Sequence, residues 1–360
     1  MTESSNDLLK VELGRAITEA LAQLPGVQID SVGPVTRADD QIGDLAIAAD
    51  VKGRPVRFLV EIKASGYPRD VQRAIWQFAP LRQVEQLVMD VPIVAAPAIS
   101  QTSRELLRRH SIGYWDTGGS LYVDLPWALY WLDRPVPAGA PRLLRSVYHG
   151  STASVLHALL LEPHKAWHIT ELAERVGVSA STTHQVCMFL EQQLWMEREG
   201  KGPRAVRLLR EPGALLDAWA AEHSLAEYAP HRFYRWSRDP SALIQTVCEA
   251  LTAHGVDYAL TLDSGAQQLA PFGTNAERVW LLVPASAPIE QIARAVDLRA
   301  VEEGESVTFL VTREPSPLLF RQRVGELCVA SDVQLYLDLW TWPRRGKEQA
   351  RHLRAERLRY

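Results

Sequence analysis

Residues 43–63 read GDLAIAADVKGRPVRFLVEIK, and this stretch decides the fold of the first part of the chain. Apolar residues alternate with small or polar ones on both sides of a Lys-Gly-Arg-Pro segment, which is the period of strands with one buried face. A two-residue turn at Gly53-Arg54 would place Leu45 opposite Ile62 and Ile47 opposite Val60. The stretch therefore predicts an antiparallel hairpin with one apolar face.

Three charged residues fall on the other face of this predicted hairpin. The same register places Asp44 opposite Lys63 and Ala46 opposite Glu61. Carboxylates on neighbouring strands suit a hard cation, so Asp44 and Glu61 are candidate ligands of Mg²⁺ or Mn²⁺. Lys63 could then orient or deprotonate an attacking water. A one-residue slip would separate the groups, and a solvated hairpin face is the simpler alternative.

Asp44 with Glu61-Ile62-Lys63 resembles the motif of the PD-(D/E)XK nuclease superfamily, an Asp on one strand and Glu-x-Lys on the next. The Pro that usually precedes the Asp is absent. The resemblance covers roughly the first 130 residues and implies a restriction-endonuclease-like mixed sheet and metal-dependent DNA cleavage. Members often add a Glu from the first helix and a Gln from the helix after the Lys strand, for which the candidates are Glu12, Glu19, Gln72 and Gln77.

The surroundings of the hairpin predict an α/β domain over residues 1–140. Helical spacing of apolar residues predicts helices over 6–24 and 69–88, the second kinked at Pro80. Apolar runs predict strands over 91–99, 112–116 and 120–124. Gln77 on the second helix could position substrate or metal-bound water, although a packing or surface amide is the commoner role. A proline-containing linker over 134–141 ends the domain.

Composition bounds the class of protein. A chain of 360 residues with 47% hydrophobic content predicts two or three folded domains. Its net charge of −4 gives no global attraction to DNA, so a DNA-binding face needs local clusters of Arg and Lys. The three cysteines are far apart, which predicts a reduced, cytoplasmic protein without structural zinc. No apolar run reaches the roughly 18 residues of a membrane helix, so no membrane partner is expected.

Residues 169–197 read ITELAERVGVSASTTHQVCMFLEQQLWME, a helix-turn-helix pattern. Thr170 is the expected cap of the first helix, Gly177 makes the turn and Ser179 caps the second helix. Residues 195–209 then alternate around Gly-Lys-Gly-Pro, as the strands of a wing would. The segment resembles the winged-helix family and predicts a DNA-binding domain over residues 146–225.

Side chains on the second helix and the wing are the candidate contacts with double-stranded DNA. The N-terminal half of a recognition helix reaches base edges, and basic wing residues reach phosphates. A winged helix that binds protein instead is the alternative. The candidates are Ser181, Thr182, His184, Gln185, Lys201, Arg204 and Arg207, with Arg198 adding charge to the wing.

Residues 226–360 predict a small α/β domain, with helices over 243–254 and 289–296 and strands over 258–262, 279–284 and 307–311. The segments YALTLDSGAQQLAPF (258–272) and SDVQLYLDLWTWPRRGKEQARHLR (331–354) resemble the C-terminal half of AbiEi-type antitoxins, the regulators of type IV toxin–antitoxin loci. This resemblance implies operator binding and a cognate toxin protein as partner. A homodimer would match the two-fold symmetry of many operators.

Two hypotheses follow from these patterns. The first is a winged-helix transcriptional regulator of the AbiEi antitoxin type that carries a nuclease-like module. The second is a Mg²⁺-dependent DNA endonuclease that its winged helix targets to DNA, with Asp44, Glu61, Lys63 and Gln77 as the catalytic residues. The first hypothesis rests on two resemblances and the second on a short motif, so we expect DNA binding first.

Overall fold

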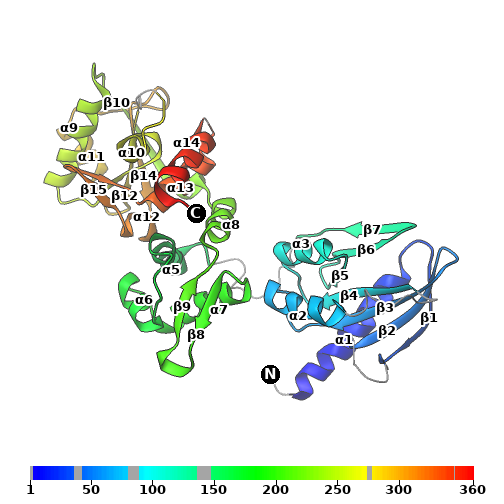
Figure 1. The fold of residues 1–360 in the computed structure, drawn as a ribbon. Coiled ribbons are helices and arrows are strands. Elements are labelled where there is room, and N and C mark those ends of the chain that lie inside the picture. Colours follow the sequence, from blue (N-terminus) through cyan, green and yellow to red (C-terminus); the bar gives the residue numbers. More distant parts are fainter. Residues whose placement is uncertain (1–2, 36–42, 80–88, 136–146, 274–277, 344) are drawn as a thin grey trace. The chain divides into compact units, whose positions relative to one another are not determined.

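A computed structural model describes residues 3–35, 43–79, 89–135, 147–273, 278–343 and 345–360. Within these ranges the chain has a mixed α/β structure (Figure 1). It divides into two compact units, Met1–Leu144 with Glu191–Leu194 and Arg145–Leu190 with Trp195–Tyr360. Most of the predicted linker lies outside the described residues. Apart from Glu191–Leu194, the residues predicted as the second and third domains share the second unit.

The first unit is built on a seven-stranded sheet with the order β1-β2-β3-β4-β5-β6-β7. Neighbours from β3 to β5 run parallel, and the remaining neighbours run antiparallel, so the sheet is mixed. The strands are β1 (Val27–Gly33), β2 (Leu45–Val51), β3 (Pro55–Ile62), β4 (Met89–Ala96), β5 (Gly113–Asp116), β6 (Leu121–Leu125) and β7 (Ala128–Leu132).

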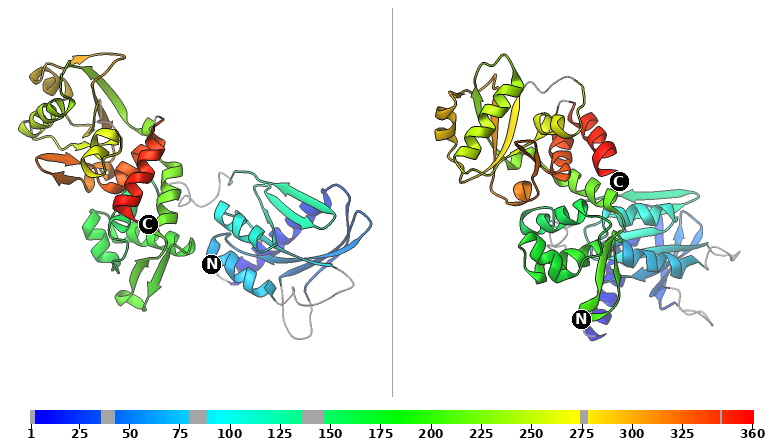
Figure 2. Two further views of the ribbon diagram at one scale, coloured as in Figure 1. Left: turned by 45° about the horizontal axis from the view of Figure 1, so that its top comes forward. Right: turned by 60° about the vertical axis from the view of Figure 1, so that its left-hand side comes forward.

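Helices cover both faces of this sheet (Figure 2). Helix α1 (Glu3–Ala22) buries Leu13, Ile17 and Leu21 against one face. Helices α2 (Pro68–Phe78) and α3 (Gln101–Arg109) cover the other face. The predicted first helix is confirmed. The second begins as predicted, and residues 80–88 of that prediction lie outside the described residues.

The register of the β2–β3 hairpin differs from the prediction. Leu45 pairs with Val60 rather than Ile62, and Ile47 pairs with Phe58. The shift is two residues, so every side chain keeps its predicted face. Ile47, Phe58 and Val60 accordingly lie in the core beneath α1, as the alternation predicted.

The cause of the shift is the turn. Val51 and Arg54 exchange backbone hydrogen bonds of 2.9 and 3.3 Å, so the turn residues are Lys52 and Gly53 rather than Gly53 and Arg54. Their φ angles are 54° and 82°, the left-handed pair of a type I′ turn. This turn matches the twist of antiparallel strands, and it leaves Pro55 free to begin β3.

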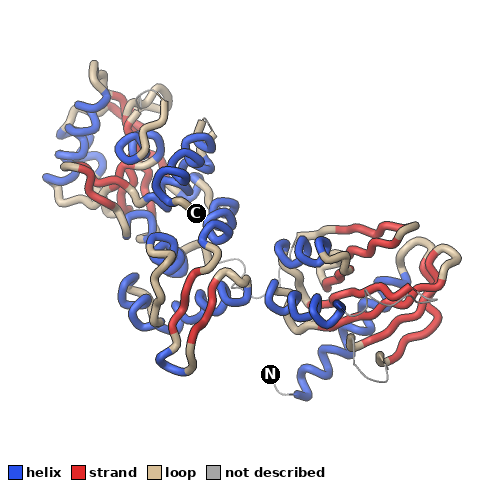
Figure 3. The backbone as a smooth tube through the Cα atoms, in the orientation of Figure 1, coloured by secondary structure: helices blue, strands red, loops and turns tan. Residues whose placement is uncertain are grey.

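The second unit begins with helices and a two-stranded hairpin at the predicted positions (Figure 3). The bridge Trp167–Arg207 adds one extended residue beside β9. The elements are α5 (Gly150–Leu161), α6 (Ile169–Val176), α7 (Ala180–Gln192), β8 (Met196–Glu199), a 3₁₀ turn (Gly202–Arg204), β9 (Val206–Leu209) and α8 (Pro212–Glu222).

A second seven-stranded sheet follows, with the order β13-β10-β14-β12-β11-β16-β15. Its strands are β10 (Ala229–Tyr234), β11 (Ala259–Leu260), β12 (Val279–Pro284), β13 (Arg299–Ala300), β14 (Val307–Thr312), β15 (Gln322–Val324) and β16 (Leu327–Val329). The accompanying helices are a 3₁₀ turn (Leu225–Glu227), α9 (Pro240–Ala253), α10 (Leu262–Leu269), α11 (Ile289–Ala295), α12 (Ser316–Leu319), α13 (Asp332–Thr341), α14 (Gly346–Leu353) and a π turn (Arg354–Leu358).

Two features of this sheet correct the sequence prediction. No strand was predicted within residues 226–240, but β10 lies there and pairs with β14. Only Phe233 of β10 is buried, so this segment lacks the alternation of apolar and polar residues from which a strand is predicted. The predicted strand over 258–262 is two residues long, because α10 begins at Leu262.

Buried hydrogen bonds join the first helices of the second unit to its sheet domain. His157 of α5 bonds to the hydroxyl of Ser331, which caps α13. The Tyr360 hydroxyl donates to the carbonyl of Leu160 at 2.7 Å. These contacts are continuous with the hydrophobic core, so α5 and α13 form parts of one body.

A second buried cluster centres on Asp338 of α13. Its carboxylate accepts hydrogen bonds from His223 at 2.9 Å, Tyr228 at 3.0 Å, Gln334 at 2.8 Å and Thr261 at 2.5 Å. Asp338 is fully buried, and three of its four donors, His223, Tyr228 and Thr261, lie far from α13 in the sequence. Gln334 is one turn away on α13 itself. A buried carboxylate needs such donors, so this cluster fixes how the segments pack.

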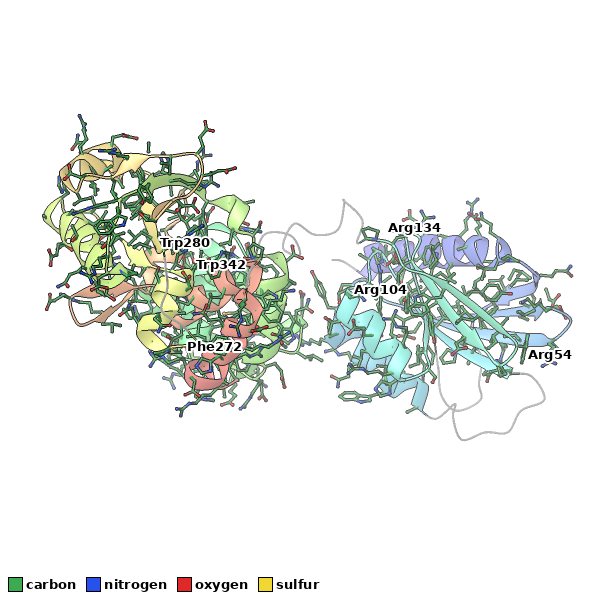
Figure 4. The ribbon with its side chains drawn as sticks, turned by 90° about the horizontal axis from the view of Figure 1, so that it is seen from above. Arg54, Arg104, Arg134, Phe272, Trp280 and Trp342 are labelled. Carbon is green, nitrogen blue, oxygen red and sulfur yellow. The ribbon has the colours of Figure 1, made fainter. Side chains whose placement is uncertain are left out.

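A buried ion pair closes one end of the first unit. Arg104 of α3 lies 2.8 Å from Asp116 at the end of β5, and the exposed fractions of their side chains are 3% and 0%. Arg104 also donates to the carbonyl of Arg134 at 2.8 Å, so these two residues, both labelled in Figure 4, lie close together. The backbone N–H of Ser120 donates to the second oxygen of Asp116.

Replacing Arg104 with Met should destabilise the first unit by about 3–5 kcal/mol, because Asp116 then stays buried without its cationic partner. Urea denaturation of the full chain measures the change. Arg109→Met is the matched control: Arg109 is exposed on the same helix, and its replacement should change stability by less than about 0.5 kcal/mol. Equal effects of the two substitutions would contradict the structural role of the pair.

The stability of the second unit should fall with acidification because of His157. Burial lowers the pKa of this imidazole from 6.5 to about 3. The unfolded chain therefore binds a proton below pH 6.5 that the folded chain binds only near pH 3. The contribution of neutral His157 to the free energy of unfolding is fully present above pH 6.5. Below pH 6.5 the free energy of unfolding decreases by about 1.4 kcal/mol per pH unit.

The variant His157→Gln isolates this effect because Gln keeps a polar group near Ser331 but does not titrate. Between pH 6 and pH 4, unfolding free energies of wild type should depend more steeply on pH than those of the variant, by about 1 kcal/mol per pH unit. Parallel pH profiles of the two proteins would show that His157 is not the titrating group.

Candidate functional site

Asp44 lies just before β2, and both oxygens of its carboxylate have partners. Oδ2 accepts a hydrogen bond from the backbone N–H of Ile62 at 2.8 Å. Oδ1 lies 2.6 Å from the Nζ of Lys10, which comes from α1. The backbone N–H of Asp44 donates to the carbonyl of Val60 at 2.8 Å. Asp44 is therefore held against β3 by backbone bonds and faces a lysine of the first helix.

A second cluster forms where β3 ends. The Lys63 ammonium lies 2.7 Å from Glu61 Oε1 and 3.2 Å from Gln77 Oε1 of α2. The exposed fractions of the Lys63 and Glu61 side chains are 19% and 9%. The structure thus brings together three of the four residues predicted as catalytic.

The predicted pairing of Asp44 with Lys63 is wrong, because the two-residue shift changes which residues face each other. Asp44 pairs with Lys10 instead. The hydrogen bond to Asp44 is the main cause that raises the pKa of Lys10, and the negative charge of Glu61 adds to it. The register that pairs Leu45 with Val60 also brings Asp44 next to Glu61, so the two ion pairs form one charge cluster.

Lys10 is the residue of this cluster that the sequence prediction missed. Glu12 is exposed, and Glu19 pairs with Arg15 at 2.9 Å, so neither candidate glutamate of α1 contacts Asp44 among the described contacts. A signal was present in Gly14, one turn after Lys10. A Cβ at Gly14 would lie 3.4 Å from the Leu45 side chain, so α1 approaches the hairpin closely there.

An open groove of 630 Å³ lies beside the Asp44–Lys10 pair. It runs along α1 and the ends of the hairpin strands, with Lys10, Gly14, Asp44 and Ile62 in its lining. Solvent and small ions therefore reach the pair from one side. The buried Glu61–Lys63 pair is less accessible.

Asp44 and Glu61 are the candidate ligands of Mg²⁺ or Mn²⁺ in this cluster. Such ions often take one or two carboxylates and keep several waters, so Asp44 and Glu61 could supply the protein oxygens. Each carboxylate already has a lysine ammonium as its partner, and the two negative charges are balanced by two positive charges. Among the described residues no three or more His, Cys, Asp or Glu side chains gather to hold a metal. The cluster as it stands does not fit a divalent cation.

The second candidate surface is α7. Ser181, His184 and Gln185 are exposed in its first half. Thr182 is half-buried and its hydroxyl bonds to that of Ser179 at 2.9 Å. Ser179 caps the helix as predicted, since its hydroxyl accepts the backbone N–H of Thr182.

Two further predictions concern the ends of α6, and one of them is confirmed. Gly177 ends α6 with a φ of 68°, in the left-handed region that glycine tolerates. Thr170 does not cap α6, because the helix already begins at Ile169 and His168 is its capping residue. The tight turn orients α7 relative to α6 without a further loop.

The hairpin after α7 carries exposed cations. Arg198, Lys201 and Arg204 are exposed on or near its tip. Arg207, predicted to contact DNA, is 5% exposed and donates to the carbonyl of Ala205. Its strand position faces inward, where Trp167 pairs with it through two backbone bonds of 2.8 Å. Arg207 is therefore a structural residue of the hairpin.

Acidic residues on the same hairpin have a cationic partner. Arg210 lies 2.7 Å from Glu197 and 3.1 Å from Glu199. This pairing offsets one of the two negative charges on β8, and the exposed Arg198, Lys201 and Arg204 outnumber the charge that remains. The tip of the hairpin is consequently positive, although the whole chain has a net charge of −4.

None of the helices in the described part of the chain is both long enough and apolar enough to cross a membrane. No family model matches the chain, and no curated protein or solved structure matches it either.

Proposed function

We propose that this chain is a transcriptional regulator that binds double-stranded DNA through α7 and the β8–β9 hairpin, in the manner of winged-helix proteins. The observation that carries this proposal is the exposed face of α7 with Ser181, His184 and Gln185, followed directly by a hairpin with exposed Lys201 and Arg204. The order of helices and hairpin is the one that this family uses.

The chemistry of the two elements suits different parts of a duplex. Gln185 can pair with the N6 and N7 edge of adenine in the major groove, and His184 and Ser181 can bond to base edges or phosphates. Lys201 and Arg204 can neutralise phosphates beside the groove. Thr182 contributes mainly to the cap of α7, because its hydroxyl is engaged by Ser179.

The C-terminal segments support a regulator of the AbiEi antitoxin type. The two segments that carry this resemblance lie against each other, since Thr261 donates to Asp338. A Cβ at Gly265 would lie 2.8 Å from the Leu335 side chain, so glycine allows this close approach. We propose a toxin protein as partner, a homodimer on a two-fold operator, and a reducing cytoplasmic setting that suits the free cysteines Cys187, Cys248 and Cys328.

A second candidate function is cleavage of DNA by the first unit. The contact of Lys63 with Glu61 and Gln77 favours it, because these residues match the nuclease motif. The lysine partner of each carboxylate opposes it, because the cluster has no net negative charge to attract a metal. We therefore propose that the first unit serves as a structural module beside the DNA-binding unit.

Gln185→Ala and Arg204→Ala should each weaken binding to duplex DNA while leaving the fold intact. Loss of a base contact by Gln185 should cost about 1–3 kcal/mol at the preferred sequence. Loss of a phosphate contact by Arg204 should weaken binding to all sequences and reduce the salt slope by about 1. Fluorescence anisotropy over a salt series, with a duplex selected from a random library, measures both effects.

Arg299→Ala is the matched control for this experiment. Arg299 is an exposed arginine of β13 in the same unit, and its removal changes the net charge as Arg204→Ala does. Its salt slope should equal that of wild type. Unchanged binding by both Gln185→Ala and Arg204→Ala would show that α7 and the hairpin are not the DNA-binding face.

Wild-type protein should not nick supercoiled plasmid in Mg²⁺ or Mn²⁺, given the balanced charges around Asp44 and Glu61. Agarose electrophoresis of plasmid after incubation tests this expectation, with Lys63→Ala and Glu61→Ala as the comparison. Metal-dependent nicking by wild type that disappears in both variants would establish the second function. Nicking that persists in both variants would indicate a contaminating nuclease.

A further inference from the structure

We propose that the Lys10 ammonium acts as a built-in cation at Asp44 and keeps a latent divalent-metal site closed. The inference concerns the first unit and refines the account of its nuclease-like cluster; it does not depend on DNA binding by the second unit. The ligand class that Lys10 excludes is a hard divalent cation with bound waters, such as Mn²⁺ or Mg²⁺.

Geometry places Lys10 where it competes directly with a cation. Its Nζ lies 2.6 Å from Asp44 Oδ1, the oxygen that does not accept the backbone N–H of Ile62. That oxygen is the one available to a metal, because the other is held by the strand. A divalent ion beside Asp44 must therefore displace the ammonium or lie next to it, and the second arrangement is repulsive.

Packing keeps Lys10 at this position. The next turns of α1 bury Leu13 and Ile17 in the core, and Gly14 lets the helix approach the hairpin. Lys10 therefore extends from an anchored helix rather than from a loose terminus. Its ammonium is also attracted by Glu61, whose charge acts on it in addition to the contact with Asp44.

Removal of the ammonium would leave the requirements for a metal site in place. The Asp44 carboxylate stays fixed by the N–H of Ile62, and the register that pairs Leu45 with Val60 brings Glu61 next to Asp44 across the two strands. The groove of 630 Å³ beside Asp44 gives access to solvent and room for water ligands. The net charge of the four-residue cluster of Lys10, Asp44, Glu61 and Lys63 changes from zero to −1, which attracts a cation.

The test is Mn²⁺ binding by the full chain, measured by electron paramagnetic resonance of free Mn²⁺ and by the shift of melting temperature with added Mn²⁺. Lys10→Ala should bind one Mn²⁺ at least about tenfold more tightly than wild type, the scale on which groups around a metal alter its affinity. Lys10→Arg should behave like wild type because it keeps the charge. Lys52→Ala, which removes an exposed lysine at the hairpin turn, should also match wild type.

Two further results decide the inference. Adding Asp44→Asn to Lys10→Ala should abolish the gained site, which assigns it to Asp44. Wild type that binds Mn²⁺ as tightly as Lys10→Ala, or a Lys10→Ala protein that gains no site, would overturn it. Lys10→Gln replaces Lys10→Ala if the latter does not fold. DNA affinity of the same variants should be unchanged, so failure of the DNA-binding proposal would be seen separately.

Discussion

The register of β2 against β3 is the constraint on which the first unit depends. β3 is buried on both faces, with Phe58 and Val60 beneath α1 and Leu59 beneath α2 and α3. The type I′ turn at Lys52 and Gly53 fixes where β2 meets it. A register displaced by one residue would exchange the side chains that face the two cores. The register in the structure differs by two residues from the predicted one, so each side chain keeps its face and only the neighbours of the charged residues change. The position of the Asp44 carboxylate beside the N–H of Ile62 follows from that register.

Two ion pairs of the first unit differ in burial and therefore in role. Arg104 and Asp116 have exposed side-chain fractions of 3% and 0%, and further hydrogen bonds surround them, so that pair organises the end of the sheet. Lys10 and Asp44 have fractions of 39% and 20% and border an open groove. A partly exposed pair of this kind contributes little to the stability of the fold. The Lys10–Asp44 contact is therefore better suited to controlling what binds at Asp44 than to holding the fold.

Strands with alternating or continuous apolar residues were predicted from the sequence, whereas strands at the edges of the sheets were missed. The hairpin strands, β12 and β14 have continuous or alternating apolar residues, and their positions were predicted closely. β1 and β7 are the two edges of the first sheet and are largely exposed, so their residues show no clear period. In the site, Glu61 and Lys63 were predicted from the hairpin and its Glu-x-Lys motif, and Gln77 from the resemblance to the nuclease superfamily. Lys10 and the inward position of Arg207 depend on tertiary packing, which no local pattern contains.

The second unit imposes a condition on how the proposed regulator could respond to a partner. α5 is bonded to the cap of α13, and the Asp338 carboxylate joins α13 to His223 after α8 and to Thr261 before α10. Separating these segments would leave a buried carboxylate without donors, which is costly. The end of α8 cannot separate from α13 without that loss, and α5 is held to the cap of α13 by the His157–Ser331 bond. A hinge between the two parts of this unit would have to break the Asp338 cluster. A partner bound to the sheet domain would therefore influence DNA binding by changing the presentation or accessibility of the whole unit.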